Sequence, residues 1–418
     1  MDLHLEKAKD KRQKAKVKIT GSKSETNRLL LLQALYPNLT LENTSNSDDS
    51  EVMLKALQNS QLPTPNSQLV DVHHAGTAMR FLTSFFAIQE GKEVVITGSS
   101  RMKERPIKVL VDALNQLGAE ISYEENEGFP PIRIKGKKLT QNKVSLPANV
   151  SSQYISALLL IAPKLENGLE LTLEGEITSV PYIKMTLALL NEIGVKTSFV
   201  GNKITVCHAE LVSASQLTVE SDWSSASYWY SIVALSEIGI QISLSSYKEN
   251  SLQGDSALVE IYQDFGVETT FNSDNSITIS KERIHNSQLT THNSQLNNSP
   301  DIAQTIAVTC FGLGMGCDLT GLHTLKIKET DRLEALKMEL TKLGAEISVT
   351  NDSLYLKSSS AIKEKISIST YQDHRMAMAF APLALKVPII IENAEVVSKS
   401  YPSFWEDLKS VGFDVNEI

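Results

Sequence analysis

The sequence has few cysteines and no long apolar run, and each shortage excludes a class of protein. Three of its 418 residues are cysteine (Cys207, Cys310 and Cys317), which gives neither a disulfide framework nor metal-ligand spacing. The longest apolar stretches, such as 157–162 and 387–391, are far shorter than a membrane span. We therefore expect a protein of the reducing cytoplasm with no membrane segment.

Positive charge is also in the minority. The 40 Lys and Arg residues are outnumbered by 49 Asp and Glu, so the net charge is −9 and the sequence pI is near 5.5. A nucleic-acid-binding protein usually presents a basic face, so we expect no nucleic-acid partner. The hydrophobic fraction of 41% is typical of a globular chain, and the length suits two domains.

The segment Met1–Lys18 is rich in lysine and lacks the apolar core of a signal peptide. We interpret it as a solvated lead-in to a strand over 15–20.

One short phrase recurs along the chain. Leu117-Gly118-Ala119-Glu120 is echoed around four later glycines at intervals of 68 to 78 residues: Gly194, Gly266, Gly344 and Gly412. An amphipathic helical pattern precedes each glycine, for example over 107–114 and 333–340. The glycine is then expected just past the helix end, where positive φ disfavours other residues.

Hairpin signals follow these glycines. Gly201-Asn202 interrupts an alternating run over 195–206, and Asp352-Ser353 interrupts another over 347–356. A further helix over 49–57 lacks the glycine but lies where an earlier copy belongs. The pattern predicts six units of roughly 70 residues, which suit two lobes of three units better than one open solenoid, whose repeats are usually shorter, about 20–50 residues. We expect the first lobe over 20–219 and the second over 1–19 with 220–418.

Four copies of Asn-Ser-Gln-Leu begin at residues 59, 66, 286 and 293. The polar segment 286–299 is interpreted as an exposed loop insertion.

The basic residues are not scattered evenly but lie in short polar strings that also contain serine, glycine or an acid. These strings are Gly21–Arg28, Ala75–Arg80, Arg101–Pro106, Ser151–Gln153, Lys328–Arg332 and Asp373–Met376. If the fold brings them together, they form a cationic pocket in an acidic protein, which suits a small substrate bearing several carboxylates or phosphates.

Several of these strings precede a predicted helix, where free N–H groups favour anions. Each has a plainer explanation: Gly21–Arg28 and Ser151–Gln153 can be ordinary helix caps, and Arg101–Pro106 can be a solvated charge run. Lys328–Arg332 is expected to open a helix, where cations oppose the helix dipole. A bound anion would offset that cost, so this string favours a functional site.

Taken in order, the strings resemble those of the EPSP synthase (3-phosphoshikimate 1-carboxyvinyltransferase) family of enolpyruvyl transferases. Asp222…Ser224–Tyr228 and Gln253-Gly254-Asp255 add to the resemblance, which runs from about Lys16 to Trp405. It implies a mixed α/β (α+β) fold of two pseudo-symmetric lobes, each of three βαβαββ units in an inside-out, barrel-like arrangement.

The resemblance also implies the reaction. The enolpyruvyl group of phosphoenolpyruvate passes to the 5-hydroxyl of 3-phosphoshikimate by addition and elimination, in the shikimate pathway of aromatic amino-acid biosynthesis. It implies no metal and no cofactor, and we expect a monomer whose partners are these two small molecules.

By the same resemblance, residues are assigned motif by motif. The catalytic residues would be Asp301, Glu329, Lys23 and Lys328. Those that bind 3-phosphoshikimate would be Lys23, Ser24, Arg28, Ser151, Ser152, Gln153, Ser179, Tyr182, Asp301 and Lys328. Those that bind phosphoenolpyruvate would be Lys23, Gly76, Arg105, Gln153, Arg332, His374, Arg375 and Lys399.

Some positions depart from the family pattern. His74 stands in place of a usual Asn, Phe81 in place of a frequent Pro, and Val180 in place of a common Lys. The stretch Thr324-Leu325-Lys326 replaces one that commonly contains Asn. These departures bear on phosphoenolpyruvate contacts and inhibitor response.

Two other functions are compatible with the fold. The related enzyme that acts on UDP-N-acetylglucosamine typically uses a cysteine in a mobile loop, and here no cysteine lies in a basic string. A non-catalytic anion-binding protein could lose Asp301 and Glu329, which are both present.

Overall fold

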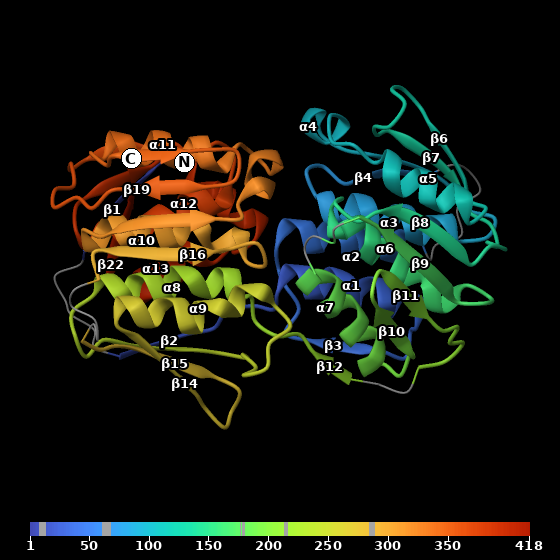
Figure 1. Cartoon of the computed structure of the whole chain (residues 1–418), viewed down its shortest axis with the longest axis horizontal. Helices are drawn as coiled ribbons and strands as arrows, with labels where there is room; N and C mark the ends of the chain where they lie inside the picture. Colours follow the sequence, from blue (N-terminus) through green and yellow to red (C-terminus); the bar gives the residue numbers. More distant parts are fainter. Residues whose placement is uncertain (8–13, 61–67, 176, 178–179, 213–215, 284–288) are drawn as a thin grey trace. The chain divides into compact units, whose positions relative to one another are not determined.

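The computed structural model describes residues 1–7, 14–60, 68–175, 177, 180–212, 216–283 and 289–418. Contacts divide the chain into two compact units. One is the segment Gly21–Val219, called here the continuous unit. The other combines Met1–Thr20 with Glu220–Ile418 and is called the split unit. Figure 1 shows the elements of each.

The four-stranded sheets of both units share one strand pattern. Two strands pair in parallel, and a β-hairpin then adds antiparallel to the second of them. In the continuous unit, in sheet order, these are β4 (Gln68–Asp71), β5 (Glu93–Thr97), β7 (Ile132–Lys135) and β6 (Glu120–Tyr123), then β8 (Lys143–Pro147), β9 (Leu169–Glu174), β11 (Lys203–Val206) and β10 (Thr197–Val200). A two-stranded parallel sheet pairs β3 (Thr40–Glu42) with β12 (Gln216–Thr218).

The split unit repeats this pattern three times. Its sheets are β2 (Lys14–Val17), β13 (Gln241–Leu244), β15 (Ile277–Lys281) and β14 (Val267–Phe271); β16 (Thr291–Gln295), β17 (Gly316–Thr320), β19 (Leu354–Leu356) and β18 (Ile347–Val349); and β20 (Ile366–Ile368), β21 (Ile389–Ile391), β1 (Leu3–Lys7) and β22 (Phe413–Glu417). In the third sheet the two ends of the chain pair antiparallel, β1 against β22.

Helices buried on nearly all sides form the centre of each unit. They are α1 (Lys23–Leu35), α3 (Gly76–Ala87) and α6 (Ser152–Ile161) in the continuous unit, and α8 (Trp223–Leu235), α10 (Ala303–Leu313) and α12 (His374–Phe380) in the split unit. In α8 every residue except Ser224 is buried. Such helices have no solvent face, which is typical of core helices. Within a unit they contact one another, as α3 and α6 do in Figure 1.

The second helix of each repeat buries one face only. These helices are α2 (Asp48–Ser60), α5 (Lys108–Gln116), α7 (Val180–Glu192), α9 (Leu258–Ile261), α11 (Arg332–Lys342) and α13 (Phe404–Ser410). In α5 the buried residues are Leu110, Val111, Ala113 and Leu114, at helical spacing. The remaining pieces are α4 (Ser100–Lys103) and the 3-10 turns η1 (Ala162–Lys164), η2 (Gly254–Ala257), η3 (Tyr262–Phe265), η4 (Pro300–Ile302), η5 (His323–Ile327), η6 (Ala381–Leu385) and η7 (Ala394–Lys399).

The glycine signal is confirmed. The five repeat glycines follow a helix or 3-10 turn with φ of +101°, +94°, +71°, +104° and +101°. Both predicted hairpins are present, with Gly201 at φ +62° between β10 and β11, and Asp352-Ser353 between β18 and β19. The helix predicted before Gly266 is broken, because η2 and η3 flank the single turn of α9.

Two interpretations of polar segments were wrong. Met1–Lys18 is not a simple lead-in, because β1 lies inside a sheet with Leu3 and Leu5 buried. The described part of 286–299 is not a plain exposed loop, because β16 pairs in parallel with β17 and buries His292. In both segments only alternate side chains face the core, so the polar ones dominate the composition.

Across the residues that the structure describes, none of the helices has the length and apolar character needed to cross a membrane.

Candidate functional site

The starts of the central helices in the continuous unit lie close together. Gln153, in the first turn of α6, donates from Nε2 to Thr77 Oγ1 in the first turn of α3, at 3.1 Å. Lys23 opens α1, and its Nζ lies 3.4 Å from Asp49 Oδ2 in the first turn of α2. The backbone N–H groups of several helix starts, with their positive dipole ends, therefore face one region.

Arg28 is a buried cation held by neutral groups. Its Nε donates to Thr186 Oγ1 at 2.8 Å, Nη1 to the Ser24 carbonyl at 2.6 Å and Nη2 to Ser156 Oγ at 3.0 Å. No carboxylate among the described residues lies within ion-pair distance of Arg28, and burial lowers the pKa of its guanidinium to about 10. A buried cation paired only with hydroxyls and a carbonyl attracts an anionic ligand.

The aromatic rings of Phe81 and Tyr182 also contact this guanidinium. The Cζ atom of Arg28 lies 5.4 Å from the centroid of Phe81 and 5.9 Å from that of Tyr182. Both distances suit cation–π contacts, which fix the direction of the side chain. Phe81, a departure from the family pattern, thus has a defined role in this chain.

Gly76 and Arg105 are brought into contact. A Cβ atom added to Gly76 would lie 2.7 Å from Arg105 Nη1, so a larger residue would make that guanidinium move from its place beside the start of α3. Arg80 holds the backbone next to Arg105 in place, because its Nη2 donates to the Pro106 carbonyl at 3.0 Å. Burial, and then the charge of Arg105, lower the pKa of Arg80 to about 10.

The serine string caps α6. Ser151 is the N-cap, and its hydroxyl accepts from the Gln153 backbone N–H at 3.4 Å. Ser152 begins the helix and is buried. Tyr182 lies in the first turn of α7, near Arg28, whereas Ser179 falls outside the described residues. The capping explanation is therefore correct for Ser151, and it leaves the hydroxyl of Ser152 available for other roles.

In the split unit, Arg332 holds three carboxylates. Its Nε donates to Asp373 Oδ2 at 2.6 Å, Nη1 to Asp301 Oδ1 at 2.8 Å and Nη2 to Glu329 Oε2 at 2.8 Å. Arg332 is 2% exposed and Asp373 is fully buried. Because a buried ion pair is stable only with good geometry and saturated hydrogen bonds, this network fixes both predicted catalytic carboxylates.

Two further cations contact Asp301. Lys328 Nζ lies 3.5 Å from its Oδ1, and Arg375 Nη2 lies 3.3 Å from its Oδ2. Asp301 follows Pro300 in η4, directly before α10, and is buried. The structure thus gathers five predicted site residues into one cluster, in which three cations contact Asp301 and Glu329 joins through Arg332: Asp301, Lys328, Glu329, Arg332 and Arg375.

The start of α12 carries the remaining predicted residues of this unit. Asp373 caps the helix by accepting from the Arg375 backbone N–H at 2.8 Å, and His374 is buried beside it. Lys399 Nζ donates to the Gln372 carbonyl at 2.7 Å. Tyr371 and Gln372 have φ of +53° and +57°, a conformation that costs energy in residues with a Cβ and often marks functional sites.

One detail of the prediction was wrong. Lys328 and Glu329 do not open a helix but lie between η5 and α11, which begins at Arg332 with Asp331 as its N-cap. Asp331 accepts from the Glu334 N–H at 3.2 Å. Carboxylates therefore already balance the positive charge of Lys328 and Arg332 near this helix start. A bound anion is not needed to explain these cations, although they can still bind one.

Asp255 was quoted as part of a motif but not assigned a role. It is buried and accepts a short hydrogen bond from Ser224 Oγ, at the start of α8. Burial, followed by the nearby charge of Asp301, raises the pKa of Asp255 to about 7. A second carboxyl therefore titrates near neutrality beside the predicted base Asp301.

Other partners could not be found from the motifs alone. Thr186 and Ser156 accept from Arg28, Thr77 accepts from Gln153, and Asp49 pairs with Lys23. Thr77 lies within the string Ala75–Arg80 but is uncharged, and the other three residues lie outside every string. Only the tertiary contacts therefore reveal these partners.

Comparison with known proteins agrees with this geometry. The sequence model of EPSP synthase (3-phosphoshikimate 1-carboxyvinyltransferase) matches residues 38–408. The chain is 45% identical over 406 residues to the 3-phosphoshikimate 1-carboxyvinyltransferase of Bacteroides fragilis strain YCH46, covering 96% of each chain. The chain belongs to the EPSP synthase family. The Haemophilus influenzae PittGG member is 35% identical, over 94% of this chain and 96% of its own.

The fold class is confirmed as that of the EPSP synthases. The EPSP synthase of Acinetobacter baumannii superposes with a TM-score of 0.80 at 21% identity, over 100% of both chains. A second structure of EPSP synthase from that organism gives 0.79. The two-lobe α/β architecture is therefore shared along the whole chain.

The Asp255 carboxyl gives a test by pH. Folding raises its pKa from 3.8 to about 7, so the folded state holds a proton that the unfolded state releases. That contribution to stability is complete below about pH 4 and is lost as the pH rises through about 7. Between pH 5 and pH 8 the wild type should lose this contribution to its free energy of urea unfolding, whereas Asp255→Asn, which cannot titrate there, should not. The free energy of unfolding of the variant minus that of the wild type should therefore increase over this range.

Ser224→Ala is the matched second variant. Its hydroxyl lowers the pKa of Asp255, so removing it should move the pH-dependent change to higher pH. Parallel pH profiles for wild type and Asp255→Asn would show that this carboxyl does not titrate in that range.

Proposed function

We propose that this chain transfers the enolpyruvyl group of phosphoenolpyruvate to the 5-hydroxyl of 3-phosphoshikimate, releasing phosphate, as the names of its family relatives state. The observation that carries the proposal is the arrangement of Asp301, Lys328 and Glu329 around the buried Arg332. Such a cluster provides both proton-transfer groups and cations for an anionic substrate.

The reaction needs a base, an acid and charge stabilisation. The 5-hydroxyl loses a proton as it attacks C2 of phosphoenolpyruvate, while C3 gains one, and elimination of phosphate reverses the C3 protonation. Asp301 and Lys328 act at the hydroxyl. Lys328 Nζ lies 3.5 Å from Asp301 Oδ1, so the two side chains can contact the same hydroxyl and share its proton. Glu329, at the edge of the cluster, serves C3.

The continuous unit binds 3-phosphoshikimate in this proposal. Ser24 and Arg28 hold the carboxylate, and this role is supported because no carboxylate in the described part of the chain forms an ion pair with Arg28. The start of α6 supplies Ser151, Ser152 and backbone N–H groups to the 3-phosphate, with Ser179 and Tyr182 adding donors. Gln153 lies along the ring, held in place by Thr77.

The residues that we assign to phosphoenolpyruvate are, in the continuous unit, Lys23, the Gly76 backbone, Arg105 and Gln153, and, in the split unit, Arg332, His374, Arg375 and Lys399. Arg332 and Arg375 are paired with the carboxylate of Asp301 in the structure. A carboxylate or phosphate of the substrate that takes over these donors would release Asp301 and Glu329 for proton transfer.

We also propose that the chain acts as a cytoplasmic monomer without metal or cofactor. One chain carries every residue that the mechanism uses. Among the described residues no group of three His, Cys, Asp or Glu side chains is arranged to hold a metal ion. The three cysteines form no disulfide.

A phosphate-release assay tests the reaction. With purified protein, release from phosphoenolpyruvate should require 3-phosphoshikimate and should continue in EDTA, because side-chain cations supply the positive charge. UDP-N-acetylglucosamine should not replace the acceptor. Phosphate release with that acceptor alone would assign the chain to the related reaction, and no release with either would leave an anion-binding protein. Activity lost in EDTA and restored by a divalent ion would refute the metal-free mechanism.

The two carboxylates are tested by amide variants of equal size. Asp301→Asn and Glu329→Gln should each lower kcat roughly 10²–10⁴-fold, the usual contribution of general acid–base catalysis, while changing KM much less. Glu346→Gln, at an exposed surface pair with Lys357, is the control and should retain activity. A normal kcat in both site variants would remove them from proton transfer.

A further inference from the structure

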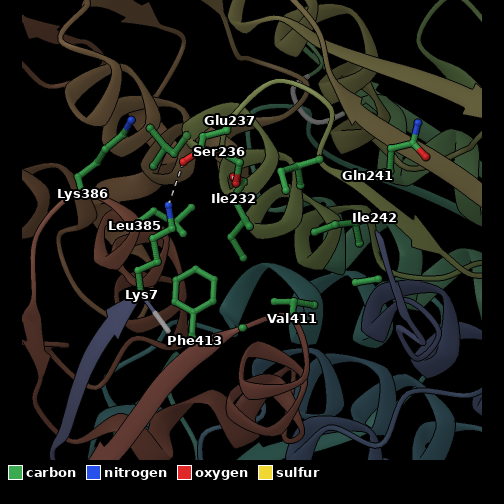
Figure 2. Close-up of a pocket in the computed structure, with 14 residues that line it drawn as sticks. Lys7, Ile232, Ser236, Glu237, Gln241, Ile242, Leu385, Lys386, Val411 and Phe413 are labelled. Atoms are coloured by element: carbon green, nitrogen blue, oxygen red, sulfur yellow. Dashed lines mark hydrogen bonds and ion pairs between the residues drawn. The ribbon is translucent and has the colours of Figure 1, made fainter. Parts of the chain in front are cut away.

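The split unit contains a cavity outside the catalytic cluster. It has a volume of roughly 320 Å³ and lies between the last turn of α8, β13, η6 and the start of β22. Its apolar lining is made by Ile232, Leu235, Ile242, Leu385, Val411 and Phe413. Figure 2 shows Ile232, Leu385 and Phe413 around one space, with Lys7 and Glu237 beside it. A volume near 300 Å³ is at the lower end for small-molecule sites.

The edge of the cavity is mainly cationic. Lys7 and Lys386 line it, and Glu237 offsets part of their charge through an ion pair of 3.5 Å with Lys7. Lys386 pairs with no carboxylate of the described residues. Partial burial lowers the pKa of Lys386, and the charge of Lys7 lowers it further. Both lysines line the same cavity, so an anion held between their ammonium groups would be stabilised.

A third lysine does not line the cavity but influences Lys386. Lys281 is 7% exposed and donates to the Phe265 carbonyl at 2.6 Å. Burial, and then the charge of Lys386, lower the pKa of Lys281 to about 8. The cavity lining itself contains two lysines and one glutamate, so it carries more positive than negative charge, in a chain whose net charge is −9.

We propose that this cavity binds a small carboxylate with a compact apolar body. Lys386 and Lys7 hold the carboxylate, and the apolar body packs against Ile232, Leu235 and Phe413. The volume excludes a protein segment or a long acyl chain, and the excess of ammonium groups disfavours a cation. The site is separate from the catalytic cluster, because Leu235 and Ser224 are at opposite ends of α8, roughly 16 Å apart at 1.5 Å per residue.

The test uses three probes that share one apolar body. 3-Phenylpropionate should bind with measurable affinity by calorimetry, in the presence of saturating 3-phosphoshikimate, which occupies the catalytic region. The neutral 3-phenylpropan-1-ol should bind more weakly, and 3-phenylpropylamine should not bind. A charge-assisted contact is worth enough that Lys386→Met should weaken 3-phenylpropionate about tenfold.

Two further variants complete the design. Lys363→Met removes an exposed lysine of the same unit that does not line the cavity and should leave the affinity unchanged. Ala15→Leu fills space at the cavity wall and should weaken all bound probes alike. Equal affinity of the acid and the alcohol, an unchanged affinity in Lys386→Met, or loss of binding when 3-phosphoshikimate is added would overturn the proposal.

Discussion

Burial of charged side chains at and near helix starts is the constraint on which the rest of this structure depends. Taking an ion out of water is costly unless other groups replace its hydration. Arg332 meets that cost with the carboxylates of Asp301, Glu329 and Asp373. Arg28 is equally buried, and its hydrogen-bond partners among the described residues are two hydroxyls and a backbone carbonyl. One unit therefore holds its charges internally balanced, while the other leaves a cation to be balanced by a ligand.

The repeat architecture explains why the charges gather. Each repeat has one fully buried helix, and three such helices pack together in each unit. A buried helix leaves its first N–H groups without partners inside the helix, so its start needs a cap or an anion. Asp222, Ser151 and Asp373 supply side-chain caps. Arg375 lies at the end that Asp373 caps, whereas Lys23 and Gly76 begin α1 and α3, whose N-caps make no side-chain hydrogen bond. The helix starts that need partners are therefore also the places where these predicted site residues lie.

Much of this was predictable from local patterns and much was not. The glycine after each helix has a local cause, positive φ, and Gly118 and Gly344 were identified without tertiary information. Strand β1 was missed because its partners are β21 and β22, at the far end of the chain. The motifs indicated Arg28 and Arg332 as anion-binding residues. The two arginines differ in what balances their buried charge: Arg28 donates to the hydroxyl of Thr186, and Arg332 pairs with the carboxylate of Asp373. Because each partner is distant in sequence, only the fold shows this difference.

Binding of 3-phosphoshikimate to Arg28→Met tests the central claim most directly. The variant removes a buried cation, while Ser156 and Thr186 keep a mutual hydrogen bond of 2.9 Å and Thr186 still donates to the Tyr182 carbonyl. We predict that calorimetry shows an affinity roughly 10–100-fold lower, the range for hydrogen bonds to a charged group, with no fall in the midpoint of thermal unfolding. Arg133→Met, at an exposed ion-pair site, should bind normally. Unchanged affinity in Arg28→Met would contradict the account.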